Sequence, residues 1–308
     1  MKNQHKIGFI LALLSILGST LMAQTPSDAL MMKKKEICIA AMYEHSWFDE
    51  YWEGTYLRHN ETIATVDRHM VMPMAAIGIV DRLNLIVAAP YVKTASREPN
   101  GGKFEGAKGF QDLSLALKGE IFNKEMGKGK LALLGTVSYS TPITNYLSDY
   151  RPYSIGFGAN ELGVRGILQY QLNSGIYIRG ALAYLFRGQT KAERDYYYNN
   201  GSYYTPWMDV PSAWNYNAVA GIWLFDSSWK IEANYMGLVS TSGDDIRAYN
   251  AAQPTNKVDM GVLGVSSQYY FKKLKGLGLL AYYSDTLSGR NVGKSAQYGV
   301  GVTYQFKL

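Results

Sequence analysis

Apolar and polar positions alternate along most of this chain. In "FQDLSLALKGEIF", residues 110–122, three leucines at positions 113, 115 and 117 fall on one side, and polar or small residues fall on the other. The segments "IYIRGALAYLFR" (176–187) and "AQYGVGVTYQF" (296–306) repeat the pattern. Because successive side chains of a strand point to opposite faces, a period of two predicts β-strands with one apolar and one polar face.

Twelve such segments can be counted, most of them about 10–14 residues long, whereas strands of soluble proteins average about 5–6. The predicted strands are 36–46, 64–80, 83–95, 110–122, 129–141, 155–172, 175–187, 214–225, 228–240, 257–271, 276–286 and 295–307.

The links between these segments alternate between short and long. The short links are 81–82, 123–128, 173–174, 226–227 and 272–275, and the long ones are 47–63, 96–109, 142–154, 188–213, 241–256 and 287–294. An even-stranded barrel with both termini in the periplasm has this rhythm of tight inner turns and longer outer loops. Asp81 and Arg82 then form one of the inner turns.

A water-soluble antiparallel sheet also alternates, so strand pattern alone leaves an exported soluble β-sandwich open. Strand length and the Tyr and Phe residues near segment ends favour a lipid environment, because aromatic rings prefer the membrane interface. A sheet in hydrocarbon must close on itself to pair its edges. We therefore predict an all-β fold: a single antiparallel transmembrane β-barrel of about 12 strands, forming one domain over residues 24–308.

The N-terminus has the pattern of a signal peptide. Lys2 and Lys6 precede an apolar run over residues 7–23, and Gln24 follows. This predicts a signal peptide over residues 1–23, cleaved after Ala23, with a membrane-anchoring helix as the competing interpretation. Residues 24–35 are too few for a folded plug domain, which argues against a large energy-coupled transporter. The predicted location is the outer membrane of a Gram-negative cell.

Composition agrees with a barrel and narrows the chemistry. The chain has 25 Tyr, 31 Gly and one Cys, with a formal net charge of +6. Tyr and Gly enrichment is typical of β-proteins with many turns and aromatic girdles. A single cysteine, Cys38, excludes a disulfide framework within the chain. The positive charge is spread out, so we predict no nucleic-acid partner, and we predict no cofactor.

Two segments resemble a known family. "GIVDRLNLIVAAPYV" (78–92) and "GFQDLSLALKGEIF" (109–122) are similar to the signature of the outer-membrane barrel family named for the meta-cleavage pathway of phenol degradation. The resemblance covers about a third of the chain after residue 23, and the chain departs from barrels that end on an aromatic residue, because Lys307 and Leu308 follow Phe306. It implies a transporter-like barrel for small molecules, with aromatic or hydrophobic compounds as solutes. The matching positions are Asp81, Arg82, Leu83, Pro90, Tyr91, Gly109, Asp112, Leu113 and Lys118.

Polar side chains on the predicted inner face carry charges of both signs. Twelve strands lie between the eight that leave an interior filled by side chains and the sixteen to eighteen that leave an aqueous channel. The charges either line a selective pore or form internal salt bridges that rigidify a closed barrel. The candidate lumen-lining residues are Asp112, Lys118, Glu120, Glu161, Arg165, Arg179, Arg187, Lys230, Glu232 and Asp259.

Aromatic residues cluster in two of the long links. They either capture a ligand at the cell surface or pack the loops and the membrane girdle. The candidate surface-loop aromatics are Trp47, Trp52, Tyr196, Tyr197, Tyr198, Tyr203, Tyr204 and Trp207.

Catalysis is not expected. His45, His59 and His69 are the only histidines after residue 23, and no G-x-S-x-G nucleophile elbow occurs. His45 with Asp49 and Glu50 lacks a known metal-ligand spacing, so no metal site is predicted. The sequence therefore predicts an outer-membrane channel or transporter for small solutes, with outer-membrane lipids as partners. The alternatives are a closed structural or surface-binding barrel without transport, and a barrel enzyme; the solute and oligomeric state stay open.

Overall fold

A computed structural model of the chain describes residues 24–61, 64–98, 105–247 and 252–308. The predicted signal peptide over residues 1–23 lies outside the described residues. Among the described residues, no helix has the length and apolar character needed to cross a membrane.

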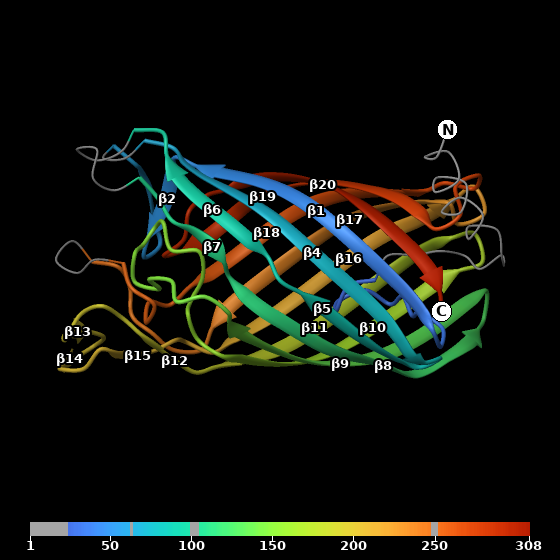
Figure 1. Ribbon diagram of the computed structural model, residues 1–308, viewed down its shortest axis with the longest axis horizontal. Coiled ribbons are helices and arrows are strands. Elements are labelled where there is room, and N and C mark those ends of the chain that lie inside the picture. Colours follow the sequence, from blue (N-terminus) through green and yellow to red (C-terminus); the bar gives the residue numbers. More distant parts are fainter. Residues whose placement is uncertain (1–23, 62–63, 99–104, 248–251) are drawn as a thin grey trace, which may run out of the picture.

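The described chain folds into a closed antiparallel barrel (Figure 1). One 14-stranded sheet runs from β1 to β7 in spatial order, and β1 also pairs with β4, which closes the cylinder. The sheet strands are β1 (Glu36–Phe48), β4 (Val66–Val80), β5 (Leu83–Ala88), β6 (Tyr91–Ser96), β7 (Lys108–Phe110), β8 (Asp112–Met126), β9 (Gly129–Pro142), β10 (Glu161–Leu172), β11 (Ile176–Arg187), β16 (Ala213–Leu224), β17 (Trp229–Ser240), β18 (Asp259–Tyr270), β19 (Leu277–Arg290) and β20 (Ala296–Lys307).

Two of the barrel-spanning strands are each interrupted once, so the fourteen segments make twelve barrel-spanning strands. Strands β5 and β6 are separated at Ala89 and Pro90, and β7 and β8 at Gln111. Proline has no N–H to donate to the neighbouring strand, which explains the break between β5 and β6. The second break lies opposite the first, where the Gln111 N–H donates to the Pro90 carbonyl at 2.9 Å.

All twelve predicted strands are present, but several ends differ. The segment 155–172 becomes a strand only at Glu161, because residues 155 and 159 are buried in a loop instead. Strand β8 continues to Met126, past the predicted end at residue 122, so the turn shrinks to Gly127 and Lys128. A register shift lies in β8 between Glu120 and Phe122, a β-bulge that sequence periodicity does not show.

Short hairpins within the long connections extend from the barrel at one end. They are built from β2 (Glu50–Glu53) with β3 (Tyr56–His59), β12 (Gln189–Lys191) with β15 (Trp207–Asp209), and β13 (Tyr197–Tyr198) with β14 (Ser202–Tyr203). The five tight turns and the C-terminus lie at the other end, as Figure 1 shows.

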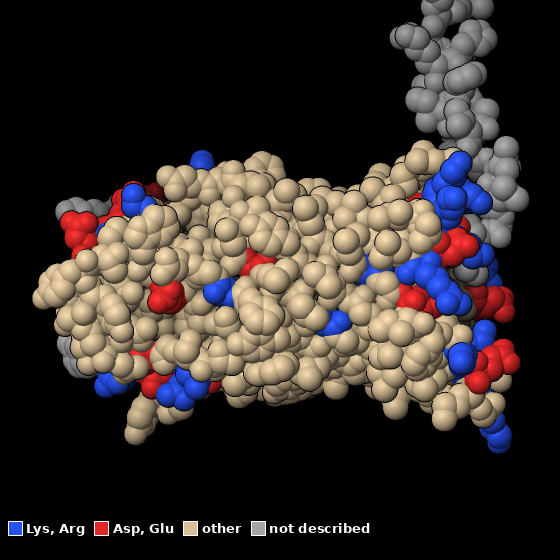
Figure 2. Space-filling view, turned by 90° about the horizontal axis from the view of Figure 1, so that it is seen from below, with Lys and Arg blue, Asp and Glu red and all other residues tan. Residues whose placement is uncertain are grey.

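The outward face is apolar around the middle of the barrel. Five apolar side chains there are between 38% and 54% exposed, namely Leu115, Val137, Leu168, Leu182 and Val265. A continuous exposed apolar surface of this kind marks contact with a membrane or a partner. In Figure 2 most charged residues gather at the two ends, and only isolated charged spots are visible on the surface between them. This belt has the character that a bilayer demands of a barrel wall.

Candidate functional site: the barrel lumen

The segment before β1 lies inside the barrel at the turn end (Figure 1). Its four consecutive residues 29–32 pack against different parts of the wall. Met32 contacts Ile86 and Ala116, Ala29 and Met31 contact Leu134 and Ile167, and Leu30 contacts Trp223 and Tyr270. The segment therefore crosses the lumen from wall to wall, a role that residues 24–35 were not predicted to have.

A fully buried asparagine of β5 holds both ends of this segment. The Asn84 side-chain oxygen accepts hydrogen bonds from Gln24 Nε2 at 2.8 Å and from the Met32 backbone N–H at 3.0 Å. The Asn84 amide donates to the Met32 carbonyl at 2.9 Å. The segment is thereby folded back on itself and fastened to the wall.

A buried ion pair fixes the middle of the segment. Lys118 Nζ lies 2.7 Å from Asp28 Oδ1, and it also donates to the Thr25 carbonyl at 2.7 Å. The Lys118 side chain is 0% exposed and that of Asp28 is 6% exposed. Burial by itself raises the pKa of the Asp28 carboxyl, but Lys118, Lys230 and Arg179 outweigh it, so the pKa lies below its ordinary value. Asp28 is therefore ionised at neutral pH.

The segment leaves the lumen through a close contact with β4. The Lys35 N–H donates to the Gly78 carbonyl at 2.9 Å, and the Lys34 N–H donates to Asp81 Oδ1 at 2.9 Å. A Cβ at Gly78 would collide with the Lys33 carbonyl, so only glycine permits this approach. The Asp81 of the family-like "GIVDRL" stretch thus anchors the N-terminal segment as well as forming a turn.

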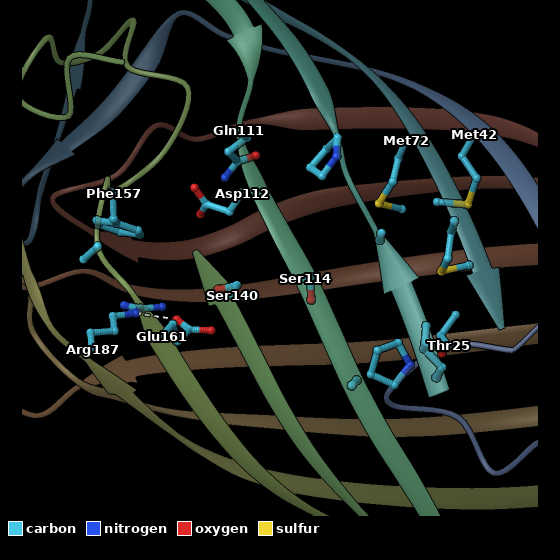
Figure 3. A pocket seen from close by; sticks show the side chains of 17 residues that line it. Thr25, Met42, Met72, Gln111, Asp112, Ser114, Ser140, Phe157, Glu161 and Arg187 are labelled. Carbon is cyan, nitrogen blue, oxygen red and sulfur yellow. Dashed lines mark hydrogen bonds and ion pairs between the residues drawn. The ribbon is translucent and has the colours of Figure 1, made fainter. Parts of the chain in front are cut away.

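Beyond this segment the lumen contains a cavity of about 510 Å³ (Figure 3). One wall is apolar and carries the methionines 42, 72 and 74 with Ile86. The other end is polar and carries Asp112, Glu161 and Arg187, as Figure 3 shows. Thr25 and Pro26 of the N-terminal segment also line the cavity, so this segment and the solute space are in direct contact.

The polar end of the cavity has one carboxylate more than it has cations. Arg187 Nε pairs with Glu161 Oε2 at 2.7 Å. Asp112 Oδ1 accepts a hydrogen bond from Tyr146 at 2.6 Å, and none of the ion pairs between described residues includes Asp112. Two carboxylates and one guanidinium line this space, so the lining carries a net charge of −1 when all are ionised.

The aromatic ring of Phe157 lies beside two guanidinium groups at the outer end of the cavity. The ring centre is 4.7 Å from the Arg151 guanidinium carbon and 4.8 Å from that of Arg187. Burial lowers the pKa of Arg151 to about 10, which leaves it charged at neutral pH. Of these three residues, Phe157 and Arg187 line the cavity itself.

A second charged group lies on β11 and β17, nearer the short-turn end than Arg187 of the same strand β11. Arg179 pairs with Glu232 at 3.0 Å, Lys230 lies 3.5 Å from the same carboxylate, and Tyr177 donates to it at 2.6 Å. Arg179, Lys230 and Glu232 face a smaller cavity of about 350 Å³ that shares Thr25, Met42 and Met74 with the first. The lumen thus contains both paired charges and open space.

The candidate lumen residues fall into two groups. Nine of them lie on the inward-facing positions of their strands. Glu120 is at the turn end, where Arg82 Nε is 3.7 Å from its carboxylate. The other eight alternate in step with buried or cavity-lining neighbours, and they are Asp112, Lys118, Glu161, Arg165, Arg179, Arg187, Lys230 and Glu232.

Asp259 is different. Its register partner is the outward-facing Val239, and its parity is that of exposed Leu263 and Val265. It lies at the long-loop end of β18 and accepts the Ser240 N–H at 2.9 Å. Asp259 is therefore not part of the lumen wall. Beyond the apolar belt, an outward side chain meets water and can be charged. The presence of a charged residue near a strand end therefore does not tell whether its side chain faces the lumen or the outside.

The candidate loop aromatics are also divided. Trp47 belongs to β1 and faces outward, 5.2 Å from the His45 ring. Trp52 (8% exposed) and Tyr197 (5% exposed) are buried inside the loops. The remaining candidates, Tyr196, Tyr198, Tyr203, Tyr204 and Trp207, lie in the hairpins between β11 and β16, and Tyr204 is 84% exposed.

The described histidines lie on the outer wall and in a hairpin. Among the described residues, no group of three or more His, Cys, Asp or Glu side chains is placed to hold a metal ion. His45 and His69 stack with ring centres 4.5 Å apart on the outward face of β1 and β4. His59 lies in β3 near Glu50, at 3.4 Å.

Comparison with known proteins supports the fold. No family model and no curated protein sequence matches the chain. An outer membrane channel from Pseudomonas putida F1 has a similar structure, with a TM-score of 0.72 and 12% identity over 92% of this chain and 100% of that one. The translocator domain of the autotransporter NalP from Neisseria meningitidis is more distant, with a TM-score of 0.45 and 13% identity over 98% and 94% of the two chains. The first likeness shows that this chain has the fold of an outer-membrane β-barrel.

Proposed function

We propose that the protein is an outer-membrane channel for small solutes that have an apolar body. The cavity of about 510 Å³ between a methionine wall and a charged end carries this proposal. Ligand sites are commonly apolar pockets with a few placed polar groups, and this volume lies within their usual range of about 300–1,000 Å³. A closed structural barrel needs no such space.

The orientation follows from the distribution of loops and charges. In bacterial barrels the short turns face the periplasm and the long loops face outward. The apolar belt of this barrel separates two charged ends, and the C-terminus lies at the short-turn end (Figures 1 and 2). We therefore assign the hairpin end to the cell surface and the end containing Asp28 to the periplasm.

The lining predicts which solutes pass. Methionine side chains are flexible and polarizable, and they suit varied apolar or aromatic bodies. The carboxylate of Asp112 accepts a hydrogen bond from the Tyr146 hydroxyl and takes part in no ion pair between described residues, so it favours a neutral or positively charged head over an anion. The solute class implied by the family resemblance, aromatic or hydrophobic compounds, agrees with the apolar wall.

Flux into proteoliposomes tests this selectivity. Benzyltrimethylammonium, phenylmethanesulfonate and tetramethylammonium are permanently charged, so they do not leak across the bilayer as neutral forms. We expect the aromatic cation to enter faster than the aromatic anion and faster than the cation without a ring. Asp112→Asn should reduce the preference for the cation, whereas Asp226→Asn, at an exposed turn, should not.

The outcomes separate the candidate functions. Equal entry of the aromatic cation and anion would contradict the role of Asp112 but leave a channel. No entry of any solute at high protein loading would favour the closed structural barrel instead.

A further inference from the structure

Four basic residues form a single row across the outer wall of the barrel. The pairing registers place His45 opposite His69, His69 opposite Lys93, and Lys93 opposite Lys108, on β1, β4, β6 and β7. The neighbours Glu44, Val92 and Thr94 are buried toward the lumen, at 9%, 0% and 4% exposure, so these four side chains point outward.

A row of three aromatic residues and one valine lies beside it, toward the short-turn end. Tyr43, Val71, Tyr91 and Phe110 are each two residues nearer the short-turn end, about 7 Å along the strands. Tyr91 and Phe110 meet edge to face at 5.3 Å, and the Tyr43 hydroxyl is 2.8 Å from His69 Nδ1. Aromatic rings mark the level where a bilayer meets water, so the basic row lies at headgroup height.

The two lysines repel each other with no counter-ion among the described residues. Like charges directly opposite on a sheet are destabilising. The nearby carboxylate, Asp67, is already held by Arg97 Nε at 2.8 Å and by His45 Nε2 at 2.9 Å. None of the ion pairs or hydrogen bonds between described residues involves the ammonium group of Lys93 or Lys108. The wall therefore presents two exposed cations at one point, which an external anion would stabilise.

We propose that Lys93 and Lys108, with His69 beside them, bind a phosphate group of an outer-leaflet glycolipid. The phosphate lies between the two ammonium groups, and an acyl chain runs down the wall over Tyr91 and Phe110. A lipid phosphate fits better than a soluble one, because the site faces the bilayer and not the lumen or the loop surface. The assignment rests on the proposed orientation, with the hairpin end at the cell surface.

The test uses the full chain in detergent and titrates it with diphosphorylated lipid A or with its phosphate-free analogue, read by native mass spectrometry. The test variant is Lys93→Gln/Lys108→Gln. The matched control is Lys273→Gln/Lys275→Gln, two exposed lysines in the turn at the opposite end. Each lysine near an anionic lipid surface contributes about 1 kcal/mol, so the double variant should lose about thirtyfold in affinity.

The control variant should bind as tightly as the parent, and the phosphate-free lipid should bind weakly to all three proteins. Equal binding by the test variant and the parent, equal loss in the control, or equal affinity for the phosphate-free lipid would each overturn the proposal. Far-UV circular dichroism establishes that both variants are folded. Conductance of the same preparations reports separately on the channel, because both variants lie outside the lumen.

Discussion

Removing the lysine that holds the N-terminal segment should open the lumen. Lys118→Met keeps a side chain of similar length in β8 but removes the charge that faces Asp28. The Asp28 carboxylate then either stays buried without its partner or moves into water with the rest of the segment. Residues 24–35 continue covalently into β1 at one end, and after the predicted removal of residues 1–23 only non-covalent contacts would hold the other end, so release would be available to them.

The magnitude follows from the burial of the pair. Both side chains are almost fully buried, at 0% and 6% exposure, and their charged atoms are 2.7 Å apart. Removing one partner of such a pair costs about 3–5 kcal/mol. That cost shifts the ratio of seated to released segment by a factor of about 10²–10⁴.

Single-channel recording in planar bilayers measures the shift as open probability. The matched control is the double variant Asp28→Leu/Lys118→Met, in which both partners become apolar. Replacing both members of a buried pair is commonly near neutral or stabilising, so the double variant should stay closed more often than Lys118→Met. Protease cleavage within residues 24–35 should follow the same order.

Two results would refute this reasoning. One is an open probability for Lys118→Met equal to that of the parent. The other is a double variant that is as open as the single one, since the ion pair would then not be what seats the segment. Acid gives an independent check. The pKa of Asp28 is lowered in the folded protein, so its contribution is present above about pH 4 and is lost as pH falls through that lowered pKa. Conductance should therefore stay constant between pH 8 and pH 5 and rise only in stronger acid.

Three further predictions concern other parts of the barrel. Gly78→Ala places a Cβ against the Lys33 carbonyl, so it should raise basal conductance and make residues 24–35 more sensitive to protease, and an unchanged cleavage rate would contradict the close contact. Arg179→Met leaves Glu232 with Lys230 at 3.5 Å, so it should lower the free energy of unfolding in urea by about 2 kcal/mol and move the reversal potential toward cation selectivity. Burial raises the pKa of Asp244 in an outer loop, so the ionised carboxyl destabilises the fold above its unfolded pKa; Asp244→Asn should raise Tm at pH 8 and have no effect at pH 3, and the opposite pattern would exclude a raised pKa.

Strand periodicity predicts the barrel because a lipid-facing wall imposes it on every strand. The apolar face of each strand must contact hydrocarbon across the whole bilayer core. Leu113, Leu115 and Leu117 therefore predict β8 without any tertiary information. The alternation of short and long links then follows from closure. The prediction weakens at the strand ends, where the solvent changes from lipid to water, and Asp259 shows this directly.

The N-terminal segment could not be placed from its sequence because it obeys no repeating rule. Residues 29–32 form a short apolar run that can be taken for a linker, yet they pack against three different parts of the lumen wall. A weak signal existed in Lys118, a charge on the inner face that has to find a partner. Its partner, Asp28, is 90 residues away in sequence, and only the closed barrel brings the two together.

The cavity likewise depends on contacts between distant residues. Asp112 and Glu161 were identified as inner-face charges, but the methionine wall was not, because inner-face methionines on β1 and β4 fit either a packed interior or an open one. Which of these is present depends on how far the loop carrying Phe157 descends into the barrel. Loop packing of that kind has no sequence period.

The account as a whole is tested most directly by single-channel recording of the full chain beside a chain that lacks residues 24–33. We predict rare, small conductance steps for the full chain and frequent, larger steps for the shortened one, because the barrel beyond the segment already contains open space. If the shortened chain inserts and folds but shows no steps at high protein loading, the lumen is not a pathway and the channel proposal is wrong.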